Sequence, residues 1–214
     1  VPLPTYPFQR KSFYMNPVPE RNAAGFGGNT QGEIHPYLGV RIDSPLLGED
    51  AFLFQGIFTE TWPTFLQQHK IFDTIISPGA AHLCMALSAW RNEKGNVPCL
   101  LGNVDLTSPL VIEEEGSRVV QMILEQKGAS QAAFRLMSKG TAEHFQKWIC
   151  HCTGEVQGID PTRPLETIAI PRIKERCQES LTTQELYTYI ESLGYKVGPL
   201  FQCVREIYQG ENES

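Results

Sequence analysis

The feature that most constrains the fold is one helical segment followed by a long run of strand-like segments. Pro78 suits the first position of a helix, Ser77 can cap it, and Gly95 can end it. The apolar face predicted for this helix consists of Leu83, Leu87 and Trp90. A shorter helix is predicted after the strands, where Thr182 and Glu185 have capping-box spacing.

The strand-like segments alternate in the way expected of a sheet with one buried face. In residues 51–59, Phe52, Phe54 and Phe58 fall on one side, and we interpret this stripe as core. Further strands are predicted over residues 110–113, 118–126, 132–138 and 144–153. One helix combined with such a run of strands predicts an α+β fold with an antiparallel sheet.

Composition excludes several classes of function. The net charge is -6 with a pI near 5.4, which argues against a nucleic-acid partner. No run of about 18 apolar residues occurs, so no membrane span is expected. The six cysteines form no tight framework, and the proline-rich N-terminal segment lacks the apolar core of a signal peptide. We therefore expect reduced thiols in a cytoplasmic protein.

The run Cys150-His151-Cys152 invites interpretation as a metal site. In a regular strand the two cysteines would point to one face and His151 to the other, so the three could not converge. No second ligand pair lies nearby in the sequence. We interpret the run as part of a strand, and we expect no metal.

Four short segments carry a resemblance to a known family. They are Leu3-Pro-Thr-Tyr-Pro-Phe-Gln-Arg10, His35-Pro-Tyr-Leu-Gly39, His69 to Pro78, and Gly194-Tyr-Lys-Val-Gly-Pro-Leu-Phe201. In this order they resemble the dehydratase domain of modular type I polyketide synthases and the linker that precedes it. The family's signatures are His-x-x-x-Gly-x-x-x-x-Pro and Gly-Tyr-x-x-Gly-Pro-x-Phe.

The resemblance implies a hotdog fold, in which a long helix lies in a curled antiparallel sheet. Residues 33–155 would form the N-terminal hotdog of a double hotdog, and residues 182–214 would be the truncated beginning of the second. Residues 1–32 would be the linker that follows an acyltransferase, and residues 156–181 a linker between the two hotdogs.

The resemblance also implies a chemistry, the removal of water from a β-hydroxyacyl thioester to give an α,β-unsaturated acyl chain. His69 would be the catalytic base, since histidine exchanges protons near neutral pH. The oxyanion and tunnel residues would be Pro78, Gly79, Tyr195, Gly198, Pro199 and Phe201. No cofactor is implied, because the acyl chain is carried on the phosphopantetheine arm of an acyl carrier protein. Its partners would be that carrier, the neighbouring synthase domains and a second copy in a homodimer.

Two departures from the family pattern leave an alternative open. Asp73 stands where the first signature has glycine, and its carboxylate, if near His69, would weaken that base. In the family an aspartate from the second hotdog protonates the leaving hydroxyl, yet every aspartate of this chain precedes Gly198. The chain would therefore be either the base half of a dehydratase or an inert pseudo-dehydratase with a structural or docking role.

Two weaker interpretations complete the set. A single-hotdog thioesterase or a cyclase-like relative could use the same base, but thioester hydrolysis needs an activated water for which no second acidic group is placed. His82 lies on the predicted helix, and we interpret it as a packed or rim histidine rather than a second base. A lone hotdog leaves a sheet edge exposed, so we expect the chain to self-associate.

Overall fold

The protein is described from a computed structural model. The described residues are 35–113, 116–140, 147–160, 162, 169–177 and 179–210. The predicted linker over residues 1–32 lies outside them, as do the first residues of the strand predicted from residue 144. Among the described residues, no helix is long and apolar enough to cross a membrane.

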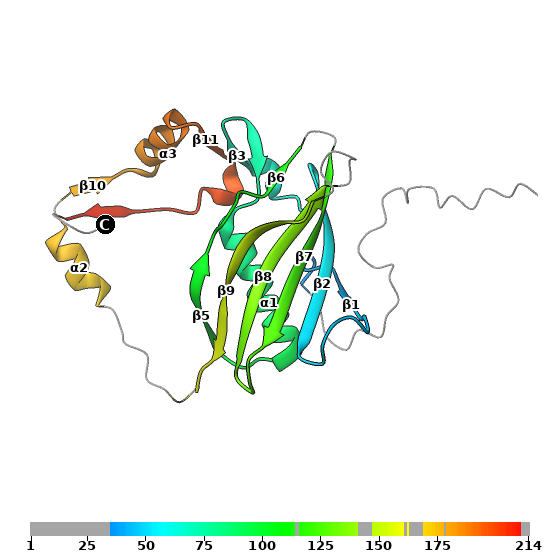
Figure 1. The fold of residues 1–214 in the computed structure, drawn as a ribbon. Coiled ribbons are helices and arrows are strands. Elements are labelled where there is room, and N and C mark those ends of the chain that lie inside the picture. The colour runs from blue at the N-terminus through cyan, green and yellow to red at the C-terminus, as the bar shows by residue number, and fades with distance from the viewer. Residues whose placement is uncertain are drawn as a thin grey trace, which may run out of the picture.

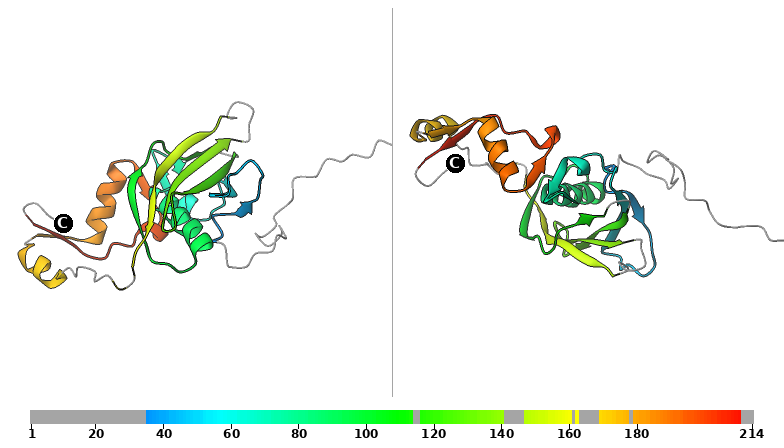
Figure 2. Two further views of the ribbon diagram at one scale, coloured as in Figure 1. Left: turned by 60° about the horizontal axis from the view of Figure 1, so that its bottom comes forward. Right: turned by 90° about the horizontal axis from the view of Figure 1, so that it is seen from above.

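A six-stranded antiparallel sheet forms the body of the molecule, in the order β1-β2-β7-β8-β9-β5 (Figure 1). Its strands are β1 (Val40–Ile42), β2 (Ala51–Thr59), β7 (Ser117–Gln126), β8 (Gln131–Gly140), β9 (Ile149–Gly158) and β5 (Cys99–Asp105). The three long central strands pair over nearly their whole length. The sheet curls around one helix, α1 (Gly79–Lys94), as Figure 2 shows from two further sides. This is the arrangement expected of a hotdog.

The core lies between α1 and the concave face of the sheet. The helix contributes a buried stripe at helical spacing, made of His82, Met85, Ala86, Ala89 and Trp90. The sheet supplies alternate residues of its long strands, among them Phe54, Phe58, Met122, Leu124, Phe134 and Leu136. Burial of each large apolar side chain stabilises the fold by about 1.5–3 kcal/mol. Phe54 and Phe58 confirm the predicted phenylalanine stripe, and Phe52 packs against it.

The helix differs from its prediction in its start and in its buried face. Pro78 has extended backbone angles and is itself the cap residue, so α1 begins at Gly79, one residue later than predicted. The side chain of Ser77 therefore does not cap the helix. Leu87 is exposed, because the buried stripe is rotated toward His82 and Met85. Gly95 ends the helix as predicted, with a φ of 71°.

A smaller antiparallel sheet, in the order β11-β3-β4-β6, covers the end of the molecule where α1 begins. Its strands are β11 (Tyr195–Val197), β3 (His69–Ile71), β4 (Thr74–Ile76) and β6 (Val111–Ile112). The remaining elements are the 3-10 turns Leu66–Gln68 and Pro199–Phe201, helices α2 (Ile170–Arg176) and α3 (Thr183–Ser192), and the pair β10 (Glu179–Leu181) and β12 (Ile207–Gln209). The predicted capping box of α3 is present in full.

Several strand predictions differ from the structure in position or partner. The strand predicted over residues 110–113 is β6, which joins the smaller sheet. The strand predicted over residues 144–153 runs five residues further, to Gly158. Edge strand β5 was not predicted, because its outward face carries Leu100 and Val104 and breaks the alternation. Within the stretch predicted as a linker, residues 156–181, the structure forms α2 and β10.

The geometry predicted for Cys150, His151 and Cys152 is wrong. Leu136 pairs with Cys152 and Met137 with Cys150, so His151 is an extra residue in a β-bulge. The bulge interrupts the alternation, and both His151 and Cys152 are buried. The strand assignment itself is confirmed.

Candidate active site

His69 begins strand β3, and one contact fixes the orientation of its ring. Its Nδ1 lies 2.7 Å from the carbonyl oxygen of Ile76, the last residue of the neighbouring strand β4. A carbonyl oxygen can only accept, so Nδ1 carries the proton and donates it. In the neutral form of the ring, this contact leaves the lone pair on Nε2, as a general base needs.

The chain runs directly from this contact into α1. The N–H of Ser77 donates to the carbonyl oxygen of Leu110 over 2.9 Å, which holds the segment against the strand region that contains β6. Pro78 is buried and extended, and the helix then begins at Gly79 without a side-chain cap. The exposed fraction of Leu106 is 58%, and its side chain lies against Gly79, where an added Cβ would be 2.9 Å from it.

The segment Gly198–Phe201 packs on the residues around His69. Val197 pairs with His69 across β11 and β3. The N–H of Gly198 donates to the carbonyl oxygen of Gln68 over 2.8 Å, and the N–H of Leu200 donates to Gln68 Oε1 over 2.9 Å. A Cβ at Gly198 would lie 2.7–2.8 Å from the Gln68 side chain, so this close approach requires glycine.

An aromatic wall adjoins His69. The Phe201 ring centroid lies 5.1 Å from that of His69, and Phe65 lies 6.4 Å from Phe201. Tyr37, from the segment that opens the fold, continues the wall at 5.0 Å from Phe65. The structure thus brings parts of three separated sequence segments together around one histidine. Gln68 was missed by sequence reasoning, because nothing in a single sequence marks a glutamine as the acceptor for a segment 130 residues away.

The other predicted site residues lie further along the same segment. Tyr195 pairs with Ile71, two residues along β3 from His69, and its exposed fraction is 42%. Tyr195 and Gly198 line a groove of about 710 Å³ between α3 and β11, which also includes Gln68. Pro199 is exposed at the start of its 3-10 turn.

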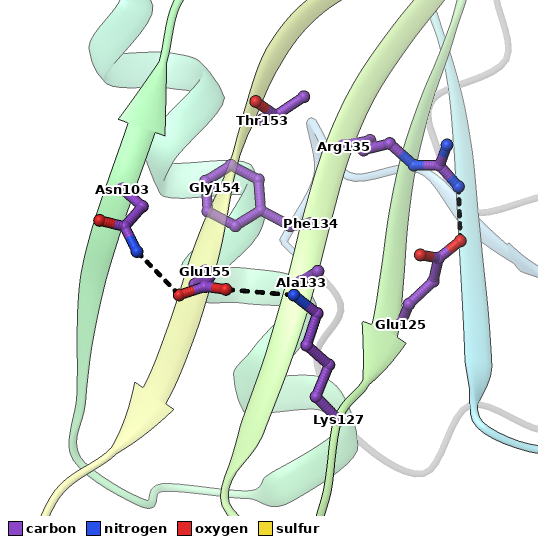
Figure 3. A pocket seen from close by; sticks show the side chains of 9 residues that line it. All are labelled: Asn103, Glu125, Lys127, Ala133, Phe134, Arg135, Thr153, Gly154 and Glu155. Atoms are coloured by element: carbon purple, nitrogen blue, oxygen red, sulfur yellow. Dashed lines mark hydrogen bonds and ion pairs between the residues drawn. The ribbon is translucent and has the colours of Figure 1, made fainter.

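A second hollow, of about 290 Å³, lies on the outer face of the main sheet (Figure 3). Glu155 accepts hydrogen bonds there from Lys127 and Asn103, and Arg135 is paired with Glu125. The bond from Lys127 is the main reason why the pKa of Glu155 is lowered. These paired charges indicate an ordinary solvated sheet face. His69 lines neither hollow.

Asp73 lies at the tip of the β3–β4 hairpin. Phe72 and Asp73 both have positive φ values, 48° and 62°, as a tight two-residue turn requires. The Asp73 carboxylate accepts a hydrogen bond from Lys196 Nζ over 2.6 Å, and this ion pair lowers the pKa of Asp73. The charge that we considered as a perturbation of His69 is thus neutralised at the exposed tip of the hairpin.

A buried polar cluster lies behind the candidate base. His82 Nε2 lies 3.2 Å from Ser77 Oγ, and burial lowers the pKa of His82 to about 4. His151 lies close enough to contribute to that shift, and burial lowers its own pKa as well. His151 donates from Nδ1 to the carbonyl of Ser108, while Nε2 lies 2.7 Å from Ser138 Oγ. Both histidines are therefore neutral at pH 7, as expected of packed histidines.

Within the described part of the chain, no group of three or more His, Cys, Asp or Glu side chains is arranged to hold a metal ion. Burial raises the pKa of Cys152 to about 11, so that thiol is no nucleophile at neutral pH. His69 is only half-buried, whereas His82 and His151 are buried, so His69 is the candidate base of this region.

Comparison with known families gives a consistent result. Residues 35–139 match the model of the family described as polyketide synthase dehydratase domain. The chain is 27% identical over 218 residues to polyketide synthase GfsA of Streptomyces halstedii, and 29% identical over 222 residues to pikromycin polyketide synthase component PikAII of Streptomyces venezuelae. Each alignment covers 99% of this chain, but only 3% and 6% of these relatives.

Solved structures show the same fold. The dehydratase domain from the CurF module of curacin polyketide synthase superposes with a TM-score of 0.74 at 25% identity. The corresponding domain from the CurK module gives a TM-score of 0.74 at 22% identity. The alignments cover 83% and 82% of this chain, and 63% and 62% of the solved chains. The fold is therefore the N-terminal hotdog of a double hotdog, as predicted.

Proposed function

Because the chain is homologous to the dehydratase domains of modular polyketide synthases and carries the N-terminal hotdog part of one, we propose that it supplies the base of a β-hydroxyacyl thioester dehydratase. His69 removes the α-proton. The observation that carries this proposal is the contact between His69 Nδ1 and the Ile76 carbonyl, which places the proton of the neutral ring on Nδ1 and leaves the Nε2 lone pair of that form free to accept the α-proton.

The proposed reaction follows from the surroundings of this nitrogen. Nε2 takes the α-proton, and the electron pair of the C–H bond moves toward the thioester carbonyl. The amides at the uncapped start of α1, near Gly79, stabilise the developing negative charge on that carbonyl oxygen. Collapse of the enolate forms the double bond and expels the β-hydroxyl, which leaves as water after protonation by an acid. Phe201 and the aromatic wall shield the base on one side.

The acid and the partners extend this proposal beyond the described residues. By resemblance, the acid is an aspartate of the second hotdog. Tyr195, Gly198 and Pro199 lie at the beginning of that hotdog and would line the substrate tunnel. The substrate arrives on an acyl carrier protein within a larger cytoplasmic synthase. Residues 33–155 and 182–214 remain our proposed division into the first hotdog and the beginning of the second.

Deuterium exchange tests the base without requiring the acid. The chain is incubated in D₂O with a carrier protein that bears a β-hydroxyacyl thioester, and the acyl mass is followed. We expect gain of deuterium at the α-carbon that is lost in His69→Ala. Loss of 18 mass units would show in addition that an acid is available. Equal exchange by wild type and His69→Ala, with both proteins folded, would contradict the proposal.

An inert pseudo-dehydratase is the second candidate. One observation favours it, the aspartate in place of the signature glycine at residue 73. In that case the chain spaces or docks neighbouring domains and catalyses nothing. A folded wild-type chain that exchanges no α-deuterium, even at high concentration of the acyl carrier, would favour this function over catalysis.

A further inference from the structure

Two polar side chains of the buried polar cluster, Ser77 and His82, are paired directly behind the candidate base. Ser77 and His82 each have an exposed fraction of 3%, and Ser77 Oγ lies 3.2 Å from His82 Nε2. The other ring nitrogen of His82, Nδ1, is buried and has no hydrogen-bond partner among the described residues. Burying a polar pair is costly unless the contact is made, so this pair constrains the two elements that carry it.

The elements in question are the two that the proposed reaction uses. Ser77 follows the strand β4, and His82 lies one turn into α1. The Ile76 carbonyl and the Ser77 N–H belong to one planar peptide group. Its carbonyl accepts from His69 Nδ1 over 2.7 Å, and its N–H donates to the Leu110 carbonyl over 2.9 Å.

The position of this peptide group therefore sets the position of the base. Its carbonyl oxygen and its N–H group are both hydrogen-bonded, and the Ser77 side chain adds a third contact next to it. Since that side chain is held by His82, a shift of α1 relative to β4 would move the Ile76 carbonyl and, with it, the His69 ring. The same helix begins at Gly79, whose amide we assign to the thioester oxygen.

We propose that His82 is a positioning residue, which through Ser77 fixes the peptide group that orients His69 relative to the start of α1. The inference rests on the proposed function of His69. His82 touches no substrate, because it is buried, and it acts only through the Ser77 side chain. The buried Ser77–His82 contact therefore fixes the distance between the base and the N-terminus of α1.

The tautomer of His69 gives a readout that a merely structural role would not move. Two-bond ¹H–¹⁵N correlation spectra of the chain distinguish a proton on Nδ1 from one on Nε2. We expect the wild type to show the Nδ1–H form. In Ser77→Ala and in His82→Phe we expect a shift toward the Nε2–H form, because the Ile76 carbonyl is no longer held against the ring. His82→Gln retains a nitrogen donor near the position of Nε2, so we expect it to restore the Nδ1–H form.

The matched control is a smaller side chain at the other end of the core, Val156→Ala. Val156 is fully buried, two residues from Gly158, which packs against Trp90. Trp90 lies 11 residues past Gly79 and so about 16 Å along the helix. Val156→Ala should lower the melting temperature and leave the tautomer of His69 unchanged. If His82→Phe does not fold, Ser77→Ala tests the same contact with a smaller change.

The outcomes separate this inference from the proposed function. An unchanged Nδ1–H tautomer in folded Ser77→Ala and His82→Phe would overturn the positioning role, whatever the activity. If the wild type exchanges deuterium, we expect Ser77→Ala to lower kcat about tenfold with little effect on KM. If the wild type exchanges none but the tautomer still shifts in the variants, the positioning role stands and the catalytic proposal fails.

Discussion

At the scale of single residues, burial rather than charge pairing sets the protonation of the core histidines. His82 and His151 are buried, and no carboxylate of the described residues pairs with them. Both pKa values are lowered mainly because burial penalises the charged form. At the surface, charge pairing dominates instead, because the ion pair with Lys196 favours the charged form of Asp73 and lowers its pKa. We therefore expect the buried histidines to make stability depend on pH.

Acidification should destabilise the protein through His82. Below pH 6.5 the unfolded chain protonates His82, but the folded chain does not do so until about pH 4, so stability is lost as pH falls through this range. We expect a loss of about 2 kcal/mol from His82 between pH 7.5 and 5. Urea denaturation at several pH values measures it. His82→Gln should flatten this dependence, and an equal slope in that variant would contradict our assignment.

Removal of the Asp73 carboxylate should leave the base unaffected. Asn tolerates the positive φ of this turn, so Asp73→Asn removes only the ion pair with Lys196. We expect the His69 tautomer and the rate of α-proton exchange to stay at their wild-type values. Lys196→Ala is the matched variant from the other side of the pair. A clear change of the exchange rate in both variants would show that the hairpin tip influences the site.

At the scale of elements, the site depends on one strand pairing between distant parts of the chain. β11 pairs with β3, and the turn that follows it docks on Gln68 through two hydrogen bonds. These contacts place the Phe201 ring beside the His69 ring. The sequence signature that contains Gly198 thus packs around the proposed base, His69.

A methyl group at Gly198 should disturb this docking. An added Cβ would overlap the Gln68 side chain at 2.7–2.8 Å, so Gly198→Ala should displace the turn and move Phe201 away from His69. We expect a loss of about 1–3 kcal/mol in stability and a lower exchange rate. In Gly102→Ala, the control, a Cβ meets nothing within 4 Å. Similar behaviour of the two variants would show that the close approach is unimportant.

At the scale of the whole molecule, the main sheet ends on an apolar edge. Among the described strands, β5 pairs only with β9, and the exposed fractions of Leu100 and Val104 are 52% and 40%. Leu106, just past β5, covers Gly79, so this edge is continuous with the candidate site. An edge of this kind favours association with a further sheet.

We therefore expect the 214-residue chain to self-associate through the β5 edge. Light scattering should show a dimer or larger species in the micromolar range. Lysine at Leu100 and Val104 should shift it toward the monomer, because charged side chains oppose pairing at a sheet edge. The matched double variant places lysine at Val40 and Ile57, which are exposed elsewhere on the sheet. A stable wild-type monomer would contradict this expectation.

The local features of this protein were determined by its sequence, and the assembly of the site was decided only by the tertiary structure. Gly95, the Thr182–Glu185 capping box and the strand Ala51–Thr59 were predictable, because their signals depend on residues a few positions apart. The bulge at His151, the rotation of the buried face of α1, and the contacts of His69 with Ile76 and Phe201 were not. These depend on how distant strands pair and on which side chains then share the interior, and no local pattern encodes that packing.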